Sequence, residues 1–174
     1  MLDVGGVQAL LYRCCSPSFL VSRNRVRCRS GVRVAEEFIA DYDLQTRIRA
    51  HAGDMWTDPF PPADVHFYSM IYHDWTPNVA ASLLRERVCG PGGHILIHEM
   101  LYNDEKTGPF PSRHSMIMHS DGQRGEQYSG KEISKMLREA SGKSRWANVQ
   151  LLQDIVTARK RPDRRLVVIV SLFK

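Results

Sequence analysis

Apolar and polar positions in the first part of the chain predict strands that alternate with a helix. Residues 2–6 form a short apolar strand that runs into two glycines, which favour a sharp turn. Apolar residues recur at helical spacing over residues 34–44, and residues 48–52 alternate as a strand. Residues 13–33 show no clean period, so no element is predicted there.

The same alternation continues further along the chain. Residues 65–71 are almost continuously apolar or aromatic, as buried parallel strands are. Thr76 as N-cap and Pro77 as the first helical residue predict a helix that runs through residue 88. Residues 94–102 then form a strongly strand-like segment, and a loop follows them.

The last part of the chain predicts one more helix and a hairpin. Ser129 and Glu132 have the spacing of a capping box, which marks the start of a helix. Strands at residues 151–158 and 165–173 flank a Lys-Arg-Pro-Asp turn. These elements predict an α/β fold with a mostly parallel sheet and an antiparallel C-terminal hairpin.

Residues that follow the predicted strands are candidates for a binding site, because ligands of open α/β sheets bind beyond the carboxyl ends of the strands. Gly5 and Gly6 would let a ligand approach the backbone, although a tight turn uses glycines equally well. Asp54 suits the polar edge of a ligand, and capping of the turn before Pro59 is its structural alternative.

His73 and Glu99 suit acid–base chemistry. An imidazole titrates near neutrality, so His73 is a candidate general base, with a purely structural histidine as the alternative. Glu99 can follow on an adjacent strand and orient that imidazole; otherwise it is a solvated charge at a strand end.

The cysteines and histidines predict neither a metal site nor a disulfide. The four cysteines contain no C-x-x-C pair and two of them are adjacent, so a reducing, intracellular compartment is expected. His94 and His98 would face the same way on a strand, but such a pair lacks further ligands. No apolar run reaches the length of a membrane span, which predicts no membrane partner.

The positive charge of the chain is local. The 174 residues carry 24 Lys and Arg against 19 Asp and Glu, a net charge of +5. Six arginines and no acidic residue lie between Asp3 and Glu36, which leaves 18 basic and 19 acidic residues elsewhere. An Arg-rich and Ser-rich start is typical of mitochondrial transit peptides, and arginines also suit a nucleic-acid surface. Because recognised motifs and interleaved aromatics are scarce, no nucleic-acid partner is predicted.

Three segments resemble a known family: GDMWTDPFPPADVHFYSMIYHDW, GPGGHILIHEMLYNDEKTGPFP and GEQYSGKEISKMLREA. Together with LDVGG near the start, they are similar to the catalytic domain of the S-adenosylmethionine-dependent O-methyltransferases related to caffeate and acetylserotonin O-methyltransferases. The resemblance covers residues 34–111 almost continuously and resumes over 125–140. It implies a Rossmann-like methyltransferase sheet with helices on both faces.

The resemblance also implies a reaction and its residues. S-adenosyl-L-methionine would be the cofactor, and a small phenolic or indolic hydroxyl compound would be the acceptor. His73 matches the family's general base, Asp74 its acidic neighbour that helps place the substrate, and Glu99 and Glu126 the carboxylates that flank the histidine.

Cofactor-binding positions follow from the same resemblance. Asp54 and Met55 match the pair that contacts the adenine side, and Gly5 and Gly6 match the start of the glycine loop. Ser69 occupies the position of a cofactor-contacting lysine in plant members.

Several segments depart from the family pattern. A further G-x-G is replaced by Val-Gln-Ala at residues 7–9, and residues 23–33 carry no acid where the second strand of the family ends in Asp or Glu. Residues 112–124 and 141–148 also differ, which suggests the hypothesis of shifted reading frames or mis-joined exons.

We therefore expect one incomplete catalytic domain over residues 1–174, without the N-terminal domain through which the family forms homodimers. A cytoplasmic location is expected. The alternative is a catalytically impaired remnant that acts as a protein-binding partner.

Overall fold

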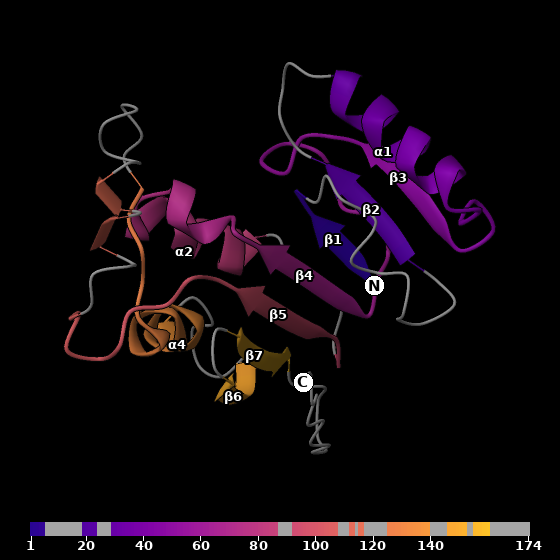
Figure 1. Cartoon of the computed structure of the whole chain (residues 1–174). Coiled ribbons are helices and arrows are strands. Elements are labelled where there is room, and N and C mark those ends of the chain that lie inside the picture. The colour runs from indigo at the N-terminus through magenta and orange to yellow at the C-terminus, as the bar shows by residue number, and fades with distance from the viewer. Residues whose placement is uncertain are drawn as a thin grey trace.

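Seven strands form one sheet within the part of the chain that the computed structural model describes, which comprises residues 1–5, 19–23, 29–86, 92–107, 112–113, 115–116, 125–139, 146–152 and 155–160. The strands are β1 (Leu2–Val4), β2 (Phe19–Arg23), β3 (Ile48–Ala52), β4 (Val65–Ser69), β5 (His94–His98), β6 (Trp146–Leu152) and β7 (Ile155–Lys160). Their order across the sheet is β3-β2-β1-β4-β5-β7-β6 (Figure 1). β1 to β5 are parallel, and β7 pairs antiparallel with both β5 and β6.

Helices cover both faces of this sheet. The helices are α1 (Arg29–Asp41), α2 (Pro77–Glu86) and α4 (Gly130–Glu139), and a 3-10 turn spans Tyr72–Asp74. Tyr68 of β4 packs in a core with α2 and α4, whereas its neighbour Phe67 packs against the cluster of Ile39, Leu44 and Ile48 beside α1. Since successive strand residues face opposite ways, the two clusters lie on opposite faces.

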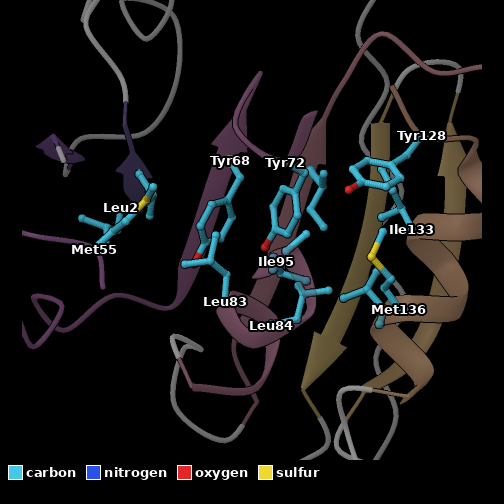
Figure 2. Close-up of a cluster of buried hydrophobic side chains, with 14 residues drawn as sticks. Leu2, Met55, Tyr68, Tyr72, Leu83, Leu84, Ile95, Tyr128, Ile133 and Met136 are labelled. Atoms are coloured by element: carbon cyan, nitrogen blue, oxygen red, sulfur yellow. The ribbon is translucent and has the colours of Figure 1, made fainter. Parts of the chain in front are cut away.

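The larger core consists of apolar side chains from strands on one side and helices on the other. Figure 2 shows Tyr68, Tyr72 and Ile95 against Leu83 and Leu84 of α2 and against Ile133 and Met136 of α4. Tyr68 and Tyr72 meet edge to face, with ring centroids 5.3 Å apart. This core anchors β4, β5 and the turn after β4, which carry the candidate site.

Most of the predicted elements are confirmed. β3 has the predicted bounds, β4 and β5 are shorter than predicted, and α2 begins at Pro77. The capping box before α4 is confirmed, because the Ser129 backbone N–H donates to Glu132 Oε2 at 2.8 Å and the Glu132 N–H donates to Ser129 Oγ at 3.2 Å. The predicted α/β fold with a parallel sheet and an antiparallel edge is also confirmed.

Two predictions were wrong. β2 lies within residues 13–33, where no element was predicted, because the three adjacent apolar residues Phe19, Leu20 and Val21 lie in an Arg-rich and Ser-rich segment without a clear period. The hairpin is formed by β6 and β7, and the predicted strand at residues 151–158 is divided between them around the polar Gln153 and Asp154. Residues 165–173 lie outside the described residues.

Candidate functional site

The order of the strands reverses beside β1, which predicts a ligand crevice at the carboxyl edge of the sheet. The chain runs outward from β1 through β2 to β3, and then crosses to β4 on the other side of β1. Ligands of open α/β sheets bind outside the carboxyl ends of the strands at such a reversal. The residues that follow β1, β3, β4 and β5 therefore surround the candidate site (Figure 1).

Gly5 lies at the end of β1. Its φ of +81° lies in the left-handed region, which side chains disfavour, and a Cβ there would collide with the Cδ1 atom of Ile71. Gly5 therefore packs closely against Ile71 of the turn after β4. Gly6, the other predicted glycine, lies outside the described residues.

His73 lies on the 3-10 turn that follows β4. The chain leaves the strand through Met70, whose φ is +55°, and its N–H donates to the carbonyl of His98 at 2.9 Å. The turn buries Tyr72 and His73, and the His73 side chain retains 6% of its exposure. A polar ring in this position requires a polar partner.

Glu99 provides that partner and is itself almost completely buried, at 1% exposure. Its Oε1 accepts the backbone N–H groups of Ile71 at 2.9 Å and Tyr72 at 2.7 Å. Its Oε2 lies 2.6 Å from Nδ1 of His73. Three donors thus hold one carboxylate, so Glu99 is not the solvated strand-end charge of the structural alternative.

The partners of the His73 ring determine its protonation. A carboxylate accepts but does not donate, so Nδ1 carries the hydrogen and the lone pair of the neutral ring is on Nε2. Nε2 lies 3.5 Å from Oδ1 of Asp74, which is partly exposed. Burial lowers the pKa of His73, but the hydrogen bond and charge of Glu99 and the charge of Asp74 together outweigh it, so the pKa is raised.

Residues 125–129 pack directly against the histidine turn. A Cβ on Gly125 would collide with the carbonyl oxygen of His73 and would lie 2.8 Å from Cα of Asp74. The Tyr128 hydroxyl donates to the carbonyl of Trp75 at 2.6 Å. Glu126 lies between these two anchors and is partly exposed. The structure therefore brings Glu126 to the same edge as His73, Asp74 and Glu99.

The candidate residues after β3 have clear structural roles. Oδ1 of Asp54 accepts the N–H of Trp56 at 2.7 Å, and the Asp54 N–H donates to Oδ2 of Asp58 at 2.7 Å. Asp54 thus caps its own turn, as the structural alternative proposed. Met55 is 4% exposed and packs beside Leu2 (Figure 2).

Ser69 ends β4, and its hydroxyl lies 2.9 Å from Nδ1 of His98. His98 is opposite Ser69 in the parallel register, at the last position of β5. β2 ends at Arg23, and residues 24–28 carry no acidic side chain. Where the family resemblance implies an acidic residue, the chain has an arginine.

Sequence reasoning missed the packing of Gly125 and the pairing of Ser69 with His98. A glycine directly before the candidate Glu126 was the available signal for the first. The second pair is separated by 29 residues, so only the register of β4 and β5 reveals it. Among the residues that the structure describes, no group of three or more His, Cys, Asp or Glu side chains is arranged to hold a metal ion. Within the same residues, no helix is long and apolar enough to cross a membrane.

A family model described as an O-methyltransferase domain matches residues 1–142. Acetylserotonin O-methyltransferase of Gallus gallus is 31% identical over 136 residues, which are 74% of this chain and 38% of that protein. The 3-hydroxy-5-methyl-1-naphthoate 3-O-methyltransferase of Streptomyces sahachiroi is 32% identical over 144 residues, 80% of this chain and 42% of that protein.

Solved structures show the same fold. An O-methyltransferase family 2 protein of Planctomyces limnophilus, in complex with apigenin, superposes with a TM-score of 0.75 and 28% identity over 91% of this chain and 50% of that one. Human N-acetylserotonin methyltransferase in complex with S-adenosylmethionine has a TM-score of 0.76 at 24% identity, over 92% and 47% of the two chains. The chain thus spans about half or less of the length of the proteins it matches.

Proposed function

This chain belongs to the family of O-methyltransferase domains, and on that premise we propose that it transfers a methyl group from S-adenosyl-L-methionine to a hydroxyl of a small acceptor, with His73 as the general base. The observation that carries the proposal is the buried hydrogen bond between His73 and Glu99 at the carboxyl edge of the sheet. A phenolic or indolic acceptor follows from the family resemblance. The acetylserotonin and naphthoate relatives support small aromatic acceptors.

The cofactor, when bound, supplies an electrophilic methyl group on a sulfonium. His73 then takes the proton from the acceptor hydroxyl on Nε2, because Nδ1 already carries the hydrogen bonded to Glu99. The oxygen becomes more nucleophilic as its proton leaves. General-base catalysis of this kind contributes about 10²–10⁴-fold to the rate.

Glu99 and Asp74 stabilise the imidazolium that proton transfer creates. The Glu99 carboxylate faces Nδ1 and cannot turn away, because the N–H groups of Ile71 and Tyr72 hold its other oxygen. Asp74 lies on the Nε2 side of the ring and is exposed enough to meet an acceptor. We assign Asp74 to substrate placement and Glu126 to the second flanking carboxylate, which the packing of Gly125 brings to this edge.

The residues at the ends of β1, β3 and β4 fit the cofactor in part. Gly5 follows β1 with a positive φ, Asp54 and Met55 follow β3, and Ser69 is the last residue of β4. These residues, with Gly6, are our candidates to hold S-adenosylmethionine. The end of β2 fits less well, because Arg23 offers no carboxylate to the ribose hydroxyls.

The arginine at the end of β2 favours a second candidate function, a catalytically impaired domain that acts as a protein-binding partner. For both candidate functions, we propose that the chain forms a single domain with the methyltransferase fold. The cytoplasmic location stays a prediction.

Calorimetric titration with S-adenosylmethionine separates the two candidates. Saturable binding with a dissociation constant below 1 mM, about −4 kcal/mol or stronger, supports the enzyme. Heat that does not differ from dilution at millimolar cofactor rejects it. Copurification with a full-length relative would then support the partner function.

A further inference from the structure

His98 is a polar side chain at the carboxyl edge of the sheet that the reaction described above does not use. It is the last residue of β5, directly before Glu99, and lies opposite Ser69 of β4 in the parallel register. His73 follows β4 at the same edge, and the His98 side chain is partly buried there.

Contacts on two sides fix the imidazole of His98. The ring is stacked on Phe67, with centroids 6.4 Å apart and planes 19° from parallel. Nδ1 lies 2.9 Å from the hydroxyl oxygen of Ser69. The backbone of His98 also accepts the N–H of Met70, the residue at which the chain turns out of β4. One residue therefore fixes both the side chain and the backbone at the end of β4.

A fixed hydroxyl binds a ligand better than a freely rotating one. Serine offers one donor and two acceptor sites, and the bond to His98 uses one of these and leaves the others available. Because the rotamer is already set, less conformational entropy is lost when a ligand bonds to the remaining sites. The strand next to β4 on its other side is β1, and ligands of open α/β sheets bind beyond the carboxyl ends of the strands at this point of reversal.

We propose that His98 is a positioning residue for the cofactor: it holds the Ser69 hydroxyl toward the polar edge of the S-adenosylmethionine nucleoside. This inference rests on the proposed function, since it requires the cofactor to bind at this crevice. The Ser69 hydroxyl, held by His98, contributes a hydrogen-bonding group at the end of β4 where the sequence resemblance implies a lysine in plant members.

A double-mutant cycle tests the proposal by calorimetry of S-adenosylmethionine binding. Ser69→Ala and His98→Leu each weaken binding about fivefold, the worth of one hydrogen bond, and the double variant is no weaker than either single variant. His98→Asn binds within twofold of the wild type, because an asparagine amide lies where Nδ1 lies. In turnover, the KM for the cofactor rises and kcat is unchanged.

His94→Leu is the matched control, because His94 lies on the same face and at the opposite end of β5. It leaves cofactor binding unchanged. Thermal unfolding of each variant is measured in parallel. A pair that only joins β4 to β5 would lower the unfolding temperature without changing affinity, and that result overturns the proposal, as does additivity in the double variant.

The remaining outcomes are also decisive. If His98→Leu does not fold, His98→Ala replaces it and carries the same predicted fivefold loss, and wild-type affinity in that variant overturns the proposal. If wild-type protein shows no binding at millimolar cofactor, the proposed function fails and the inference fails with it. If wild-type protein binds and Ser69→Ala binds equally well, the proposed function stands and the inference alone is wrong.

Discussion

The two halves of the carboxyl edge of the sheet differ in how complete they are. At the ends of β4 and β5, His73, Glu99 and Ser69 are held by short hydrogen bonds and by close packing of Gly125. At the ends of β1 and β2, Gly5 has the backbone conformation of a tight turn, but β2 ends in an arginine. Side-chain contacts thus fix the half that would perform the proton transfer. The half that would bind the ribose has an arginine where the family resemblance implies an acidic residue.

This difference teaches that catalytic geometry and cofactor affinity depend on separate parts of the sheet. The buried Glu99 is fixed by backbone donors of its own neighbourhood, so the position of His73 does not depend on the loop after β1. A chain with a weak ribose site can therefore keep an intact base. Mutations on the two sides should separate turnover from cofactor affinity.

Removal of the base has the largest expected effect. His73→Ala lowers kcat about 10²–10⁴-fold, because Nε2 no longer accepts the proton, and calorimetry shows cofactor affinity within twofold of the wild type. His51→Ala, an exposed histidine on β3, is the control and leaves kcat unchanged. Equal losses of kcat and cofactor affinity in His73→Ala would contradict the assignment.

An added methyl group on Gly125 tests the packing of the catalytic half. The new Cβ collides with the His73 carbonyl, so Gly125→Ala lowers the free energy of unfolding by about 1–3 kcal/mol and reduces kcat. Gly53→Ala is the matched control, because the nearest atom to its new Cβ is Oδ2 of Asp58 at 3.5 Å, an ordinary van der Waals distance. Chemical denaturation measures both variants. An unchanged Gly125→Ala protein would show that residues 125–129 do not pack on the histidine turn.

An acid at the end of β2 tests the incomplete half. Arg23→Asp supplies a carboxylate where ribose hydroxyls are held in related sheets, and a charged hydrogen bond predicts about tenfold tighter S-adenosylmethionine binding. Arg33→Asp, at an exposed position on α1, makes the same charge change as a control. If both variants bind S-adenosylmethionine more tightly by the same factor, the cause is the change in net charge. The claim that the end of β2 is the incomplete half of the site is then wrong.

A surface ion pair provides the smallest expected effect. Nζ of Lys106 lies 2.7 Å from Oε1 of Glu132 and ties the loop after β5 to the start of α4, with both side chains partly exposed. Lys106→Met therefore lowers the free energy of unfolding by about 0.2–1 kcal/mol, and 1 M NaCl reduces the difference. Lys135→Met, whose pair with Glu139 spans 3.8 Å, has a smaller effect. A larger loss in Lys135→Met would be inconsistent with this account.

Sequence patterns predicted the elements that have a clear period. Local residues were enough to predict β3, the start of α2 and the capping box of α4. They were also enough to predict which polar residues come directly after the strands. β2 was missed because its three apolar residues lie in a segment without period, and the hairpin was misplaced because one apolar run was read as one strand.

The site was predictable as a set of residues but not as a set of bonds. A histidine after one strand and a glutamate after the next indicated an acid–base pair. The backbone bonds that fix Glu99, the close approach of Gly125 and the Ser69–His98 pair depend on register and on tertiary packing. Apart from the glycine before Glu126, local sequence patterns carry no information on these contacts.

The pH dependence of kcat/KM in the wild type and in Glu99→Gln tests the central claim most directly. His73 must be neutral to accept a proton. Its pKa is raised above 6.5, because the hydrogen bond and charge of Glu99 and the charge of Asp74 outweigh the effect of burial. The kcat/KM of the wild type should therefore rise with pH along a limb above pH 6.5. Glutamine removes the charge, so the account predicts a limb at lower pH with a lower plateau. A limb at the same pH in both proteins would contradict the claim that Glu99 positions His73 and raises its pKa.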